Sequence, residues 1–159
     1  MDATADELAG VVDLFGGLTR PELERALSEA AFRADGQSVD ETALEAAIED
    51  ALEGFALVRH DRRVDGEERP LLVAGPTAFP SVPDHAEDVP HILEVERRRL
   101  DREALGETAR ERFEDAAADA IADGDDDRIS RLIDVSYDIE AWAPVDLEAE
   151  RAHLETASE

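Results

Sequence analysis

The sequence predicts an α+β chain that is mostly helical, with three short helices, a β-hairpin and then a helical C-terminal region. Three observations predict this class. Apolar residues recur at intervals of three and four through residues 5–53 and again beyond residue 91. Residues 55–74 instead hold two short apolar runs around Asp65-Gly66, a dipeptide that favours a tight type I′ turn. From Gly75 to Pro90, four prolines interrupt any period.

The three N-terminal helices have readable ends. The first carries an apolar face from Leu8 to Phe15, and we expect Gly16-Gly17 to end it. Thr19-Arg20-Pro21-Glu22 has the pattern of a capping box, in which the threonine hydroxyl and the glutamate carboxylate satisfy free backbone N–H groups. Ser38-Val39-Asp40-Glu41 repeats this pattern and predicts the start of the third helix, which Gly54 closes.

The C-terminal region is expected to be helical throughout. A short helix is predicted near Ile92 and Val95, and a longer one with a small, alanine-rich apolar face follows. Polar N-cap residues and helix-breaking residues mark where the helices beyond residue 100 begin and end. They are Asp101 (start), Gly124 (stop), Asp125 to Asp127 (start), Pro144 (break) and Asp146 (start of the terminal helix).

The segment GFALVRHDRRVDGEERPLLV (residues 54–73) resembles the exit of the third helix and the wing of winged-helix domains. The whole chain is also similar to an uncharacterised protein family of extremely halophilic archaea, through DELAGVVDLFGGLTRPEL, EDVPHILEV and IDVSYDIEAWAPVDL. The first resemblance covers roughly residues 5–75 and implies a winged-helix-like domain over residues 1–75. The prolines predict a connector over 76–90, and the helical periodicity predicts a C-terminal helical region over 91–159. The second resemblance implies a habitat and brings no catalytic residues.

The charge points to the same habitat. The chain has 42 acidic residues and 16 positive ones, all arginine, for a net charge of −26. Such a surface repels itself in dilute buffer but not in molar salt, where the Debye length falls to roughly 3 Å. We therefore expect a cytoplasmic protein of a salt-accumulating halophile. The chain has no cysteine and no apolar run long enough to cross a membrane, and from the residues after Met1 we expect no signal peptide.

Two arginine clusters are candidate contacts for nucleic acid or a partner. The first lies on the predicted hairpin, and the second is expected to form ion pairs on a helix surface with Glu94, Glu96, Asp101 and Glu103. A basic wing can contact phosphates, yet the predicted third helix offers carboxylates where base-reading helices offer donors. The alternative is a solvated hairpin whose arginines pair with neighbouring carboxylates. The clusters are Arg59, Arg62, Arg63 and Arg69, and Arg97, Arg98, Arg99 and Arg102.

No catalytic, cofactor or metal site is predicted. The four histidines are scattered without the spacing of zinc ligands, and only His85 and His91, on either side of Asp88, come near a metal-binding pattern. The acidic run at residues 123–127 lacks the ligand order of a calcium loop. The chain also lacks a phosphate-binding glycine loop and a nucleophile motif.

Aromatic residues mark a second candidate contact. Tyr137 and Trp142 lie close together in a chain with only 4% aromatic residues. They are predicted either to anchor the C-terminal helices or to form an interface with a partner protein or a second copy. Phe79 is expected to pack the connector onto the same region. The sequence therefore favours a non-enzymatic protein-interaction or assembly module, with a winged-helix DNA-binding regulator as the alternative.

Overall fold

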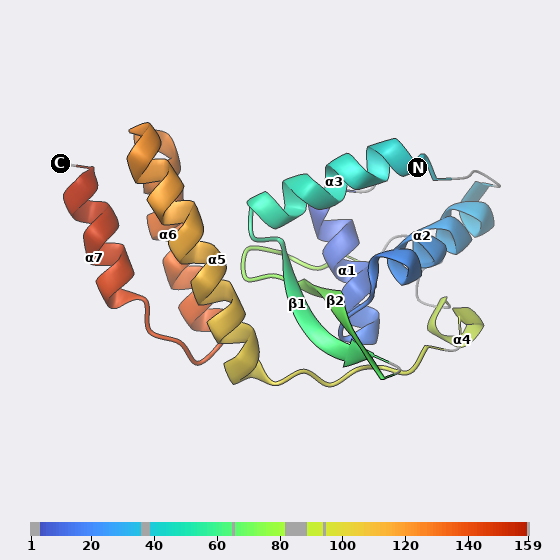
Figure 1. The fold of residues 1–159 in the computed structure, drawn as a ribbon. Helices are drawn as coiled ribbons and strands as arrows, with labels where there is room; N and C mark the ends of the chain where they lie inside the picture. Colours follow the sequence, from blue (N-terminus) through green and yellow to red (C-terminus); the bar gives the residue numbers. More distant parts are fainter. Residues whose placement is uncertain (1–3, 36–38, 65, 82–88, 94, 159) are drawn as a thin grey trace. The chain divides into compact units, whose positions relative to one another are not determined.

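The computed structural model describes residues 4–35, 39–64, 66–81, 89–93 and 95–158. The predicted class is confirmed, since three helices precede a two-stranded antiparallel hairpin and further helices follow (Figure 1). The chain forms two compact units, Met1–Leu100 and Asp101–Glu159. The predicted limit near residue 75 falls inside the first unit. Within the described residues, no helix has both the length and the apolar surface that a membrane crossing requires.

The first unit begins with α1 (Ala5–Phe15), α2 (Arg20–Asp35) and α3 (Glu41–Glu53). The predicted capping box of α2 is confirmed: Thr19 N donates to Glu22 Oε1 at 2.9 Å, and Glu22 N donates to Thr19 Oγ1 at 3.4 Å. Gly16 follows α1 with φ +80°, a conformation that costs glycine little. The predicted cap of α3 is corrected. Asp40 is the N-cap, because its carboxylate accepts from Thr42 N at 3.0 Å, and Ser38 lies outside the described residues.

The hairpin comprises β1 (Leu57–Val64) and β2 (Glu67–Ala74), paired from Leu57 opposite Ala74 to Val64 opposite Glu67. Gly66, in the turn, has φ +83°. On its other side, β2 exchanges two backbone hydrogen bonds between Leu72 and Leu18, the residue that joins α1 to α2. The hairpin is thus tied to the helices through β2, and β1 is the outer strand.

The core of the first unit lies between the apolar faces of the three helices and the inner end of the hairpin. Phe15, Leu23, Ile48 and Leu57 are all buried in it, at exposures of 2% or less. The chain after the hairpin returns to α1, because Ser81 N donates to the carbonyl of Asp6 at 3.0 Å. A short helix, α4 (Val89–Leu93), then adds its first residue to the core.

The second unit consists of α5 (Arg102–Asp123), α6 (Asp126–Trp142) and α7 (Glu148–Ala157). Their facing sides bury Leu105, Phe113, Ile129 and Leu154. The predicted starts at Asp101 and Asp125 are confirmed, since each carboxylate accepts a backbone N–H of the following helix. Gly124 ends α5 in the left-handed region at φ +61°.

Candidate interaction surfaces

The hairpin arginines divide between the two faces of the sheet. Residues directly opposite each other in an antiparallel pair share a face, and neighbours along a strand alternate. Arg62 lies opposite Arg69, so both occupy one face, whereas Arg59 and Arg63 occupy the other. The predicted cluster is therefore two pairs rather than one continuous positive patch.

Most of these arginines already have partners. Arg59 lies 3.8 Å from Glu49 of α3, and Arg69 lies 2.9 Å from Glu67. Arg62 donates to the backbone carbonyl of Arg99 at 2.8 Å. These contacts match the solvated-hairpin alternative, in which the arginines are paired within the chain.

The second cluster does not form the predicted helix surface. Residues 95–100, which we call the strap, are not helical. The strap crosses the junction of α1 and α2, where Arg97 donates to the carbonyls of Asp13 and Leu14 at 3.1 and 3.3 Å. The predicted helix was wrong, and the described acceptors of Arg97 and Arg98 lie more than 70 residues away in the sequence. Glu94, one of the predicted local partners, lies outside the described residues.

Arg98 makes the strongest of these contacts. Its guanidinium binds both carboxylate oxygens of Glu22, at 2.6 and 2.9 Å, and donates to the carbonyl of Gly17 at 3.0 Å. Burial alone would raise the pKa of Glu22, but hydrogen bonds from Arg98 and Thr19 outweigh it and lower that pKa. The strap therefore fastens the start of α2, and Arg98 is unsuited to contact a partner.

The exposed face of α3 is acidic, as the sequence indicates. Glu45 pairs with Arg20 at 3.2 Å, and Glu49 with Arg59. Glu41 raises the pKa of Glu24 on α2, because the two carboxyl groups share a hydrogen bond and repel each other when both are ionised. A duplex approaching α3 would meet carboxylates at the place where base-reading helices offer arginine or amide donors.

In the second unit, Tyr137 is the more exposed of the two predicted anchors, at 55%. Arg151 of α7 lies 3.9 Å from the centre of its ring, a cation–π contact. Trp142 is half-buried, and Arg102 lies 4.6 Å from its ring centre and donates to its carbonyl at 2.6 Å. Arg102 thus satisfies the last backbone carbonyl of α6, a helix with no basic residue in its own last turn.

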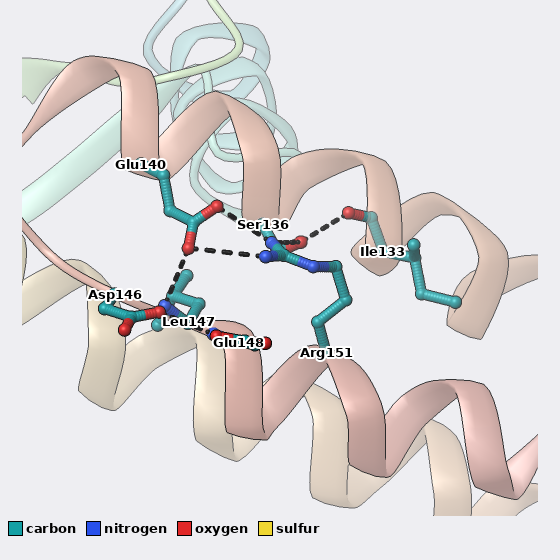
Figure 2. A network of polar contacts seen from close by, with 7 residues as sticks. All are labelled: Ile133, Ser136, Glu140, Asp146, Leu147, Glu148 and Arg151. Atoms are coloured by element: carbon teal, nitrogen blue, oxygen red, sulfur yellow. Dashed lines mark hydrogen bonds and ion pairs between the residues drawn. The ribbon is translucent and has the colours of Figure 1, made fainter.

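A polar network that includes Arg151 joins α6 to α7 (Figure 2). Arg151 reaches from α7 to Ser136 Oγ and to Glu140 Oε1, each at 2.9 Å. Glu140 also accepts from Leu147 N at 2.9 Å, and these contacts, with that of Arg151 the largest, lower its pKa. The network links α6 to α7, and the Arg151 guanidinium covers one face of the Tyr137 ring.

Two exposed phenylalanines complete the candidate surfaces. Phe32 on α2 is 69% exposed and Phe79 is 82% exposed. Phe79 was predicted to pack the connector, and this was wrong: its backbone N–H binds Asp6 Oδ1 at 3.1 Å, but its ring is exposed to solvent. Phe32 was not singled out from the sequence, although its place beside the apolar stripe of α2 gave the signal.

A shallow open groove of about 500 Å³ follows α2 and is lined by Pro21, Glu24, Arg25, Ser28, Glu29 and Leu93.

The histidines that the structure describes do not gather into a metal site. Among the residues that the structure describes, no three acidic or histidine side chains are grouped as metal ligands. Of the weak pattern noted in the sequence, His85 and Asp88 fall outside the described residues.

A family model described as "Family of unknown function (DUF7109)" matches residues 6–159, so the chain belongs to that family. No curated protein and no solved structure matches the chain.

Proposed function

We propose that this member of the DUF7109 family is a non-enzymatic protein-interaction and assembly module of a halophile cytoplasm. The exposure of its aromatic side chains carries the proposal. The chain has seven aromatic residues, and three of them, Phe32, Phe79 and Tyr137, are the large hydrophobic side chains most exposed to solvent in the described residues. Scattered aliphatic residues on a surface are ordinary, but aromatic side chains dominate the binding energy of interfaces.

The charge of the chain supports this assignment. In molar salt, attraction between exposed charges is screened beyond about 3 Å, so long-range charge contributes little to holding a partner and apolar contact gains in weight. An aromatic side chain supplies such contact over a large area, with few rotatable bonds to immobilise. The acidic surface would then keep the protein soluble between the few positions that bind.

The experiment compares capture of partners by four tagged proteins from a native host lysate in molar KCl. They are the parent chain, Phe32→Ser, Phe79→Ser and the control Ala46→Ser, which changes an exposed small residue on α3. We expect the parent and the control to capture one partner protein in stoichiometric amount. At least one phenylalanine variant should bind this partner with an affinity roughly thirtyfold lower. Equal capture by all four proteins would refute the role of the phenylalanines.

The alternative, a winged-helix DNA-binding regulator, is supported by the order of elements and by the Leu18–Leu72 bridge, which adds a third short extended segment to the hairpin. The acidic face of α3 and the paired hairpin arginines weigh against it. Sequencing the nucleic acid in the same capture tests it. DNA of defined sequence, lost when Arg59, Arg62 and Arg63 are replaced by alanine, would favour the regulator.

A further inference from the structure

Within the described residues of the first unit, no strand pairs with the outer edge of β1, and the hydrogen bonds of β2 show which residues form that edge. Leu72 uses both its N–H and its C=O on Leu18, at 2.7 and 3.0 Å, so neither group points toward β1. Leu72 lies opposite Arg59, which makes this a non-hydrogen-bonded pair of the ladder. The backbone N–H and C=O of Arg59 therefore point away from β2, as do those of Asp61 and Arg63, by the alternation along the strand.

Proline at position 70 agrees with this assignment. Pro70 has no N–H, and it lies opposite Asp61, at a position where no ladder hydrogen bond is needed. In the part of the chain that the structure describes, no hydrogen bond reaches the outward backbone groups of Arg59, Asp61 or Arg63. All three residues are exposed. Such an edge can pair with another strand.

The charges on this edge select its partner. Two copies of β1 can meet antiparallel about a two-fold axis, so that each residue of one copy faces its counterpart across the centre. If the axis passes through Asp61, then Arg59 faces Arg63 and Asp61 faces Asp61, and every pair is repulsive. If the axis passes through His60, then Arg59 faces Asp61 of the second copy, and Asp61 faces Arg59. An axis through Arg62 would also give attractive pairs, Asp61 with Arg63. It would overlap only residues 60–64 of the two strands, because β1 ends at Val64, whereas the axis through His60 overlaps residues 57–63.

We propose that the chain forms a two-fold homodimer by antiparallel pairing of its β1 edges, centred on His60, with two reciprocal Arg59–Asp61 pairs. The inference rests on the proposed assembly function and adds to it a self-association surface made of residues other than the exposed phenylalanines. Backbone hydrogen bonds hold the strands, and the two charge pairs set the register. Arg63 faces Leu57 in this arrangement, so it takes no part in the charge pairing.

The test uses the full chain in molar KCl, with mass measured by sedimentation over a series of concentrations. The parent should be dimeric at the upper concentrations. Arg59→Asp and Asp61→Arg each replace two attractive pairs by two repulsive ones and should weaken the dimer roughly tenfold. When these two variants are mixed, the introduced aspartate of one chain faces the introduced arginine of the other, and a mixed dimer should form with about the parent's affinity.

Two further variants make the test specific. Asp61→Pro removes an outward N–H without removing a ladder bond, and should give a folded monomer, with circular dichroism as the check on folding. Arg63→Asp should dimerise like the parent. A parent that stays monomeric at every concentration would overturn the proposal. A mixed dimer of Asp61→Arg with Arg63→Asp that forms with the parent's affinity would also overturn it, because it would show that position 61 faces position 63. If the dimer is absent but the phenylalanine-dependent capture persists, only this inference fails.

Discussion

Replacing Arg98 by alanine tests whether the strap is an integral part of the first unit. The change removes both hydrogen bonds to the Glu22 carboxylate and the one to the carbonyl of Gly17. The Arg98 and Glu22 side chains are only 16% and 17% exposed, so the carboxylate would remain largely buried without its counter-ion. Glu22 would keep its capping contact with Thr19.

The expected cost follows from this burial. Breaking a fully buried ion pair costs about 3–5 kcal/mol, and hydrogen bonds to charged groups are worth about 1.5–3 kcal/mol. Roughly a sixth of each side chain still meets water, so we expect the free energy of unfolding to fall by about 3 kcal/mol, the value at which the two ranges meet. For a unit of this size, that corresponds to a fall in melting temperature on the order of 10–20 °C.

Urea unfolding in molar KCl measures the effect, with Arg99→Ala as the matched control from the same strap. Arg99 has an exposed side chain, and only its backbone carbonyl binds Arg62, so its loss should cost less than about 0.5 kcal/mol. In the double variant with Glu22→Gln, the two costs should not add, because both changes break one interaction. Equal stabilities of the Arg98→Ala and Arg99→Ala proteins would refute the reasoning.

Two other predictions concern backbone space and pH. Gly16→Ala should destabilise far more than Gly66→Ala in the same urea assay: both glycines have positive φ, but a Cβ at Gly16 would clash with the Arg98 carbonyl oxygen, whereas one at Gly66 meets no atom within 4 Å. Gly66→Ala should therefore cost only the conformational strain, about 1–2 kcal/mol, and equal costs would contradict the position of the strap. The lowered pKa of Glu140 means that its contribution is complete above its ordinary value of 4.5 and is lost as pH falls through the folded value. The difference in unfolding free energy between the parent and Glu140→Gln should consequently shrink on acidification, and a difference that stays constant would remove Arg151 as the cause.

Features set by neighbouring residues could be predicted from the sequence. The capping box at Thr19–Glu22, the cap at Asp101 and the stops at Gly16 and Gly124 each depend on residues within one helical turn. The hairpin followed from the change of period and from one turn dipeptide. The third helix was predicted to start too early, because Ser38 and Asp40 are both good N-caps and local pattern ranks them alike.

The strap could not be predicted, for the same physical reason. Alternating arginine and glutamate around residue 98 fits helix-surface pairing, and no local signal shows that Arg98 pairs with Glu22 on another element. The hairpin arginines illustrate the other limit. Their identity was evident, but their division between two faces depends on the pairing register, which a one-residue shift would reverse. Phe79 was predicted to pack, but its exposure depends on tertiary contacts that a local sequence pattern does not contain.

Arginines from distant segments supply the positive charge at two helix ends that lack their own. Neither α1 nor α6 has a basic residue in its last turn; Arg97 donates to the final carbonyls of α1, and Arg102 to that of α6. In most helices the last turn frays alone, on a fast timescale. Here, unwinding those turns requires a remote segment to detach as well, so hydrogen exchange at the ends of α1 and α6 should report cooperative opening of a larger part of each unit rather than local fraying.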